Sequence, residues 1–241
     1  MNRIKKRKIL FILAASPLFL LGLAAFIILA PQKKPSYMAN PVYQQQVELY
    51  EIYKTTQAEV VMLGDSRTQG ASWNELLNRP SVVGRGIESD ILEGYARRLN
   101  YVYKVKPKVC FISGGVNDLY SGAYTVDQIY QSFINIVAEI KSKQITPVIQ
   151  GTVFVGKDWG KAWNITAADN KMRNGDIARL NKMLSDYAKR NKIEFLDINP
   201  RLQTYDNFLR PEFTWDGIHF RASAYKIWAE EVDKVLKKFN L

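Results

Sequence analysis

Ser66 lies where a short apolar segment of the chain ends. The apolar residues at 60–63 run directly into Gly-Asp-Ser within the sequence MLGDSRTQ. A serine hydroxyl becomes a nucleophile only when a neighbouring base takes its proton. His219 is the only histidine in the chain, and it is therefore the candidate for that base.

Asp216 stands three residues before His219 in the sequence WDGIHF. On a turn, this spacing allows the carboxylate to accept a hydrogen bond from Nδ1 of the imidazole. Such a carboxylate fixes the tautomer and stabilises the imidazolium, which leaves Nε2 free to accept the serine proton. The three residue types therefore predict acyl transfer by a nucleophilic serine.

Acyl transfer also needs hydrogen-bond donors for the negative charge that develops on the carbonyl oxygen. Asn117, in the sequence GGVND, could supply its side-chain amide, and Ser66 could supply its own backbone N–H. A third donor could come from the sequence GRGIESD at residues 84–90. Asp65 and Asp118 adjoin these motifs, and we expect structural roles for both.

Short apolar segments alternate with amphipathic segments along the chain. This pattern predicts an α/β domain with a parallel sheet covered on both faces. In such a sheet, ligands bind at the carboxyl ends of the strands. We expect strands at 59–63, 81–84, 108–115, 146–155 and 193–198, and helices at 41–56, 89–106, 125–144, 174–192 and 222–239.

Four motifs occur in a particular order: GDS, GRGIESD, GGVND and DGIH. In this order, residues 57–238 resemble the SGNH hydrolases, also called GDSL esterases or lipases. The resemblance implies a three-layer α/β/α, flavodoxin-like fold with a five-stranded parallel sheet. It also implies that Ser66 is the nucleophile, that His219 is the general base, that Asp216 orients it, and that Asn117 contributes to the oxyanion hole. It implies neither a metal nor a cofactor.

The second motif departs from the family pattern. The family usually has a glycine directly before the aspartate of this motif, whereas here Ser89 precedes Asp90 and the nearest glycine is Gly86. A backbone donor requires glycine only where φ is positive. The oxyanion donor is therefore Ser89 or Gly86, and the register favours Ser89.

Residues 9–30 form an uncharged apolar segment of 22 positions. This length matches the hydrocarbon core of a bilayer, and it exceeds that of the apolar part of a secretory signal peptide. Five cations precede the segment, which favours a cytoplasmic N-terminus. We therefore predict a single uncleaved membrane anchor, with the catalytic domain on the outer side of the cytoplasmic membrane.

Four regions follow from this interpretation. We expect a basic cytoplasmic segment at 1–8, the transmembrane anchor at 9–30, a linker and leading helix at 31–56, and the SGNH hydrolase domain at 57–241. Residues 1–34 hold seven cations and no acid, so residues 35–241 carry only +4 of the net charge of +11. This small charge argues against nucleic-acid binding, and no protein partner can be deduced.

Trp159 and Trp163 lie in a long irregular stretch at 155–170, together with Lys157 and Lys161. Aromatic faces beside cations suit a sugar ring or an anionic polymer, which makes the two tryptophans candidates for a substrate-facing wall. Packing of both rings beneath the loop is an equally open alternative.

The leading functional hypothesis is a membrane-anchored serine esterase of the SGNH type, acting on an ester-bearing substrate. Its location favours removal of acetyl or other short acyl groups from extracytoplasmic carbohydrate. An O-acyltransferase acting on polysaccharide would use the same residues, as would a phospholipase, lysophospholipase or thioesterase acting on lipid or thioester. A non-catalytic binding module is a further alternative, but the complete set of candidate residues argues against it.

Overall fold

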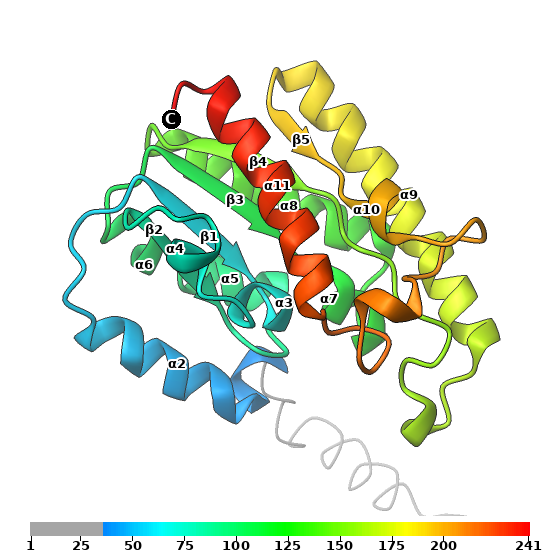
Figure 1. The fold of residues 1–241 in the computed structure, drawn as a ribbon. Coiled ribbons are helices and arrows are strands. Elements are labelled where there is room, and N and C mark those ends of the chain that lie inside the picture. Colours follow the sequence, from blue (N-terminus) through cyan, green and yellow to red (C-terminus); the bar gives the residue numbers. More distant parts are fainter. Residues whose placement is uncertain (1–35) are drawn as a thin grey trace, which may run out of the picture. The chain divides into compact units, whose positions relative to one another are not determined.

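Five parallel strands form one sheet in the computed structural model, which describes residues 36–241 (Figure 1). Their spatial order is β2-β1-β3-β4-β5, which is the order of flavodoxin-like sheets. The predicted α/β fold with a five-stranded parallel sheet is therefore confirmed. The strands are β1 (Val60–Gly64), β2 (Val82–Gly86), β3 (Val109–Ser113), β4 (Thr146–Gln150) and β5 (Glu194–Leu196).

The connections between strands are mostly helical. Residues before β1 form a short 3₁₀ turn and one helix, η1 (Ser36–Ala39) and α2 (Pro41–Ile52). The helices that follow are α3 (Ser66–Gln69), α4 (Trp73–Leu76), α5 (Leu92–Arg97), α6 (Asn100–Tyr103), α7 (Val116–Ser121), α8 (Val126–Ser142), α9 (Ala167–Asn191), α10 (Asn199–Leu202) and α11 (Ala222–Lys238). Two 3₁₀ turns, η2 (Lys161–Trp163) and η3 (Pro211–Phe213), lie in the later loops.

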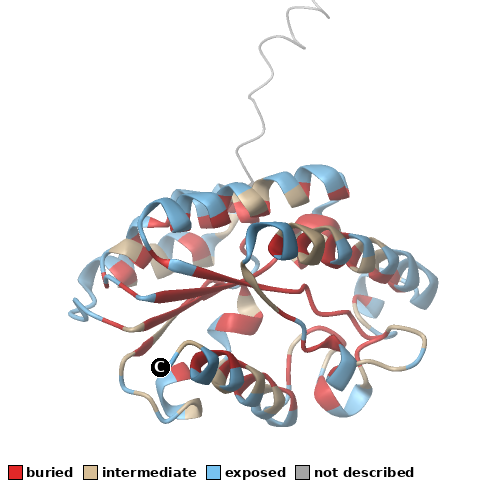
Figure 2. Cartoon of the chain, turned by 90° about the horizontal axis from the view of Figure 1, so that it is seen from above, coloured by how far each residue is buried: buried red, intermediate tan, exposed pale blue. Residues whose placement is uncertain are grey.

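The sheet is buried on both faces because helices pack on each side of it. Successive side chains of each strand point to opposite sides. In β1, Val61 and Leu63 belong to the core shared with α5, α8 and α9, whereas Val60 and Met62 belong to the core shared with α4 and α11. Figure 2 shows the buried strands between two layers of helices whose outer faces are exposed. This two-sided burial explains why the strands read as continuous apolar runs.

The order of strands reverses direction at β1. The chain passes from β1 to β2 on one side and then returns to place β3 on the other side of β1. Ligands of open α/β sheets bind at such a switch point, beyond the carboxyl ends of the strands. Ser66 follows β1 at this edge, Ser89 follows β2, and Asn117 follows β3.

The helix predicted at 89–106 is interrupted, which corrects the expectation from the sequence. It consists of α5 and α6, and the break falls at Arg98. The guanidinium of Arg98 is buried and donates to Asp90 and to the carbonyls of Arg85 and Gly64. These contacts hold the side chain of Arg98 in the interior of the protein. The predicted helix is broken at this residue.

The strand predicted at 146–155 ends at Gln150, and the reason lies in three buried asparagines. The backbone N–H groups of 152, 154 and 155 donate to side-chain oxygens of Asn181, Asn199 and Asn174 instead of to a neighbouring strand. The next helix, predicted at 174–192, begins earlier, at Ala167. A capping box between Thr166 and Asp169 starts it there.

The predicted segments at 1–8 and 9–30 lie outside the described residues. Within residues 36–241, no helix combines the length and apolar character that a membrane span requires. Residues 35–241 form one compact unit, so the leading helix predicted in 31–56 is part of the unit that contains the sheet. Helix α2 contributes Tyr43 and Tyr50 to a small aromatic core against the residues after β2.

Candidate active site

A chain of hydrogen bonds joins the three residues that the sequence predicted as a catalytic triad. Nε2 of His219 lies 3.1 Å from Oγ of Ser66, although 153 residues separate them in the sequence. Nδ1 of His219 lies 2.5 Å from Oδ2 of Asp216. This arrangement allows proton transfer from the serine hydroxyl to the imidazole, with the carboxylate stabilising the resulting imidazolium.

The carboxylate of Asp216 is held by its own turn. Its second oxygen, Oδ1, accepts the backbone N–H groups of Ile218 and His219 at 2.9 and 2.8 Å. Partial burial raises the pKa of Asp216, but the hydrogen bonds from His219 and from these amides outweigh it and leave the pKa below its ordinary value. The carboxylate therefore stays ionised at neutral pH.

Gly217, between Asp216 and His219, is required by this turn. Its φ is +97°, and a Cβ atom would lie 2.7 Å from the backbone nitrogen of Trp159. A side chain at this position would both strain the backbone and push apart two loops of the site.

Arg67 is a residue of the site that reasoning from the sequence missed. It follows Ser66, and its buried side chain donates to the carbonyls of Ile218, Val153 and Phe154 at 2.9, 2.8 and 3.4 Å. It therefore ties the loop that carries His219 to the segment after β4. The only clue in the sequence is a cation directly after the candidate nucleophile.

The backbone N–H groups of Ser66 and Ser89 are the candidate oxyanion donors from the main chain. Within the described part of the chain, neither Ser66 nor Ser89 donates its backbone N–H to another residue. Asn117 donates its side-chain amide to the carbonyl of Asp90 at 2.8 Å. This bond joins the loop of Ser89 to the start of α7 and leaves the second amide hydrogen of Asn117 available.

Ser89 and Gly86, the two candidates for the donor from residues 84–90, have different surroundings. Ser89 has φ of +56°, a backbone conformation that glycine adopts readily and serine rarely. This positive φ accounts for the glycine that the family usually has there. Gly86 is the last residue of β2, where a Cβ would lie 2.3 Å from the backbone nitrogen of Gln69. The structure therefore gives Gly86 a packing role against α3.

The loop that contains Ser89 is held by one residue before α2 and one residue of α3. Asn40 donates its side-chain amide to the carbonyl of Glu88 at 2.6 Å, and the N–H of Glu88 donates to Gln69 at 2.6 Å. The oxygen of the same Asn40 side chain accepts the N–H of Val42 and caps α2. Asn40 thus connects the leading helix to the loop of the candidate oxyanion donor.

Asn40→Asp is expected to lower kcat about tenfold with little change in KM. Aspartate keeps the acceptor that caps α2, but it loses the amide donor that holds Glu88, so the N–H of Ser89 moves away from the developing oxyanion. Steady-state kinetics on a short acyl ester, with thermal unfolding as the check on folding, measures this. Unchanged kcat would show that the loop does not depend on Asn40.

Asp65 and Asp118 are buried and occupy structural positions, in line with the expectation from the sequence. Oδ1 of Asp65 accepts the N–H of Arg67 and caps α3. Oδ1 of Asp118 accepts the N–H of Leu92 at 3.1 Å, at the start of α5. Burial raises the pKa of Asp118 from 3.8 to about 7, against the opposing effect of its backbone hydrogen bonds.

Asp118→Asn is expected to make the free energy of unfolding less dependent on pH. Because the folded pKa of Asp118 lies above its unfolded value, its stabilising contribution is complete below about pH 4 and is lost as pH rises through 7. Asparagine keeps an oxygen acceptor for Leu92 without the charge. Urea unfolding should show the variant gaining about 2 kcal/mol relative to the wild type between pH 5 and pH 8. If the free energy of unfolding depended on pH in the same way for both proteins, the effect assigned to the buried Asp118 would be wrong. Asp127→Asn, at an exposed position, is the control.

Two tryptophans contact the imidazole, and a third contacts one of them. Trp215 stacks on His219 with ring centroids 5.3 Å apart and planes 16° apart, and Trp159 meets the same imidazole edge to face at 6.1 Å. Trp163 contacts Trp159 but not His219, and 68% of it is exposed. Of the two tryptophans predicted from the sequence, only Trp159 therefore reaches the triad. Trp215 was missed, although it directly precedes Asp216.

Comparison with known proteins identifies the family. The sequence profile of the GDSL-like lipase/acylhydrolase family matches residues 62–227. The chain belongs to this family. The resemblance inferred from the four motifs is thereby confirmed, and the matched range contains the triad, the loop of Ser89 and Asn117.

Two curated proteins are similar in sequence to this family member. An N-acylneuraminate cytidylyltransferase of Streptococcus agalactiae is 29% identical over 186 residues, which cover 73% of this chain and 40% of that protein. The chain therefore spans less than half the length of this relative. An isoamyl acetate-hydrolyzing esterase of Saccharomyces cerevisiae is 25% identical over 180 residues, covering 69% of this chain and 73% of that protein.

Solved structures share the fold. A GDSL-like lipase from Bacteroides thetaiotaomicron superposes with a TM-score of 0.68 at 23% identity, covering 81% of this chain and 97% of the other. An acetyl xylan esterase superposes with a TM-score of 0.56 at 18% identity, covering 74% and 99%. At these identities the likeness concerns the fold, and the chemistry has to be argued from the site.

Proposed function

We propose that this protein is a serine esterase that removes acetyl or other short acyl groups from carbohydrate. The observation that carries the proposal is the chain of hydrogen bonds from Ser66 through His219 to Asp216, at the switch point of the sheet. The names of the similar proteins support the choice of substrate. An acetyl xylan esterase and an isoamyl acetate-hydrolyzing esterase are both named for acetyl esters.

The proposed reaction has two steps. Oγ of Ser66 attacks the acyl carbon while Nε2 of His219 takes its proton. The bond to the alcohol oxygen then breaks, the alcohol leaves with that proton, and the acyl group remains on Ser66. Water attacks the acyl-enzyme in the second step, and His219 passes the proton of this water to Oγ as the acid is released. Backbone N–H groups of Ser66 and Ser89, with the amide of Asn117, stabilise the negative charge in both steps.

The location is a further part of the proposal and rests on the sequence alone. An anchor at 9–30 would hold the esterase at the outer side of the cytoplasmic membrane, where surface carbohydrate is the nearest acylated polymer. The basic residues at 1–8 would stay in the cytoplasm. Protease protection of an epitope at each end of the full chain in intact cells tests this orientation.

Hydrolysis of p-nitrophenyl esters of increasing acyl length tests the reaction, with the full chain in detergent and Ser66→Ala and His219→Ala as controls. Turnover of acetyl esters that both variants lose supports the proposal. Preference for long acyl chains would favour a lipase acting on phospholipid or lysophospholipid. Formation of an acyl-enzyme that turns over only after a sugar is added would indicate an O-acyltransferase.

A further inference from the structure

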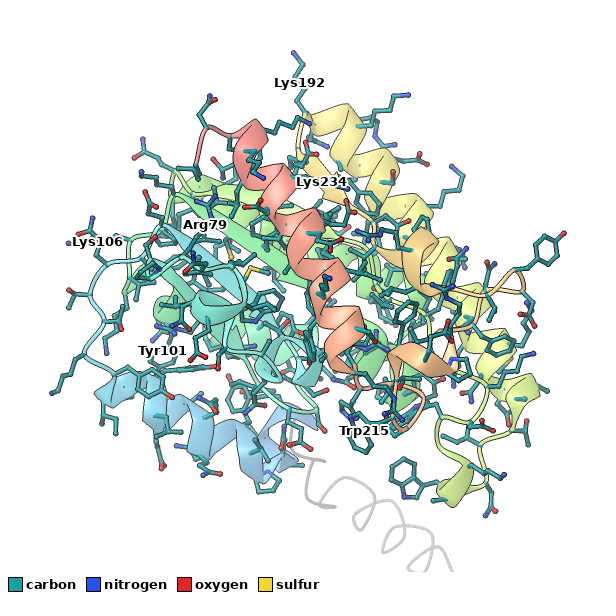
Figure 3. All side chains as sticks on the ribbon, in the orientation of Figure 1. Arg79, Tyr101, Lys106, Lys192, Trp215 and Lys234 are labelled. Atoms are coloured by element: carbon teal, nitrogen blue, oxygen red, sulfur yellow. The ribbon has the colours of Figure 1, made fainter. Side chains whose placement is uncertain are left out.

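A cavity of about 520 Å³ adjoins the triad on the side of Asp216. Two loops enclose it, one after β4 at residues 156–158 and the other between β5 and α11. Trp215, Asp216 and Gly217 form the wall that it shares with the active site. Figure 3 shows Trp215 on the loop that precedes α11, at the lower edge of the view. The volume lies within the range of pockets for small ligands, roughly 300–1,000 Å³.

The position of the cavity indicates which part of an ester it would receive. His219 takes the proton of Ser66 and must give it to the departing alcohol oxygen. The alcohol part of the substrate therefore leaves Ser66 on the side of the imidazole. Trp215 stacks on that imidazole and Asp216 binds it, and both residues line the cavity. The cavity therefore lies on the side of the site toward which the alcohol leaves.

The lining combines aromatic faces with polar side chains. The ring of Trp215, which is 64% exposed, stands at one wall together with Phe208. Asp158, Lys157 and Arg221 supply charged groups at the others. A sugar ring presents an apolar face of C–H groups and an edge of hydroxyls, which such a lining can meet. An alkyl chain in this place would instead remove the carboxylate of Asp158 from water without giving it a hydrogen-bonding partner.

We propose that this cavity is a subsite for the sugar that forms the alcohol part of the ester, with Trp215 as the platform for its ring. The inference rests on the proposed esterase function and deepens it by assigning the place where the sugar of the substrate binds. Recognition in this subsite acts mainly on substrate binding, because the cavity lies beyond the reacting atoms.

Filling the cavity without touching the triad tests the proposal. The side chain of Asp158 is exposed and makes neither a hydrogen bond nor an ion pair within residues 36–241, so Asp158→Trp should fill the space at little cost in stability. Ala162→Trp is the matched control, because Ala162 is exposed on the same loop and does not line this cavity. Each protein is assayed as the full chain in detergent on two substrates. The first is the mixed monoacetates of methyl glucoside. The second is ethyl acetate, whose alcohol is too small to reach the cavity.

Asp158→Trp is expected to lower kcat/KM for the sugar monoacetates about tenfold or more, mainly through KM. Ethyl acetate hydrolysis should stay within about twofold of the wild type, and Ala162→Trp should leave both substrates within the same limit. Equal rates for Asp158→Trp and the wild type on the sugar esters, with Ser66-dependent hydrolysis of ethyl acetate intact, would overturn the subsite and leave the esterase. Absence of Ser66-dependent turnover of either substrate would overturn the esterase itself.

Discussion

Ser66→Ala is expected to lower kcat for short acyl esters by about 10⁴-fold or more, because alanine lacks the oxygen that forms the acyl-enzyme. Oγ of Ser66 is the only serine oxygen that bonds to His219 among the described residues. The backbone N–H of residue 66 remains in the variant, so substrate binding should change little. Steady-state kinetics on p-nitrophenyl acetate, with KM and kcat determined separately, measures the loss.

Ser72→Ala provides the matched control for this variant. Ser72 lies in the next loop and precedes α4 without making a side-chain cap hydrogen bond, so its replacement should leave kcat within about twofold. A fluorophosphonate should modify the wild type on Ser66, as read by mass spectrometry of the peptide, and should leave Ser66→Ala unmodified. Activity in Ser66→Ala within tenfold of the wild type would show that another group is the nucleophile.

Asp216→Asn is expected to lower kcat by about 10³- to 10⁴-fold. The substitution is nearly isosteric, and the asparagine oxygen can still accept the N–H groups of Ile218 and His219 that Oδ1 accepts now. The amide that replaces Oδ2 is a donor, however, so it would favour the wrong imidazole tautomer and could not stabilise the imidazolium. The loss should therefore appear in kcat, with thermal unfolding close to that of the wild type.

A control variant at a second carboxylate distinguishes this electrostatic effect on His219 from the loss of hydrogen bonds within a turn. Asp197 accepts the backbone N–H of Asn199 at 3.0 Å, two residues ahead, as Asp216 does for Ile218, but it has no imidazole partner. Asp197→Asn should keep kcat within about twofold of the wild type. If Asp216→Asn were as active as Asp197→Asn, Asp216 would serve only the turn, and the catalytic assignment would be wrong.

The strands, and the position of the motifs after them, were predictable because both depend on the local pattern of apolar residues. Each central strand is a short apolar run, and burial on both faces of a parallel sheet requires this pattern wherever the strand lies. The candidate nucleophile and the candidate oxyanion residue were predictable for a similar reason, since Ser66 and Asn117 come shortly after such runs. The single histidine left one choice of base.

The boundaries of several elements were not predictable, because they depend on partners far away in the sequence. The helix predicted at 89–106 breaks at Arg98, whose guanidinium bonds to Gly64, 34 residues away. The strand predicted at 146–155 ends early because asparagines from later elements bind its backbone, as Asn199 does at Phe154. Local propensity contains no information about such contacts.

By itself, the sequence determined the α/β class and the family, and it singled out Ser66, His219 and Asp216 as the candidate residues for acyl transfer. The tertiary structure alone decided what surrounds them. It placed Arg67 against Ile218, which is 151 residues away, and Trp215 on the imidazole. The physical reason is that hydrophobic periodicity sets which segments are buried, whereas the strand order and the packing of loops decide which side chains meet at the edge of the sheet.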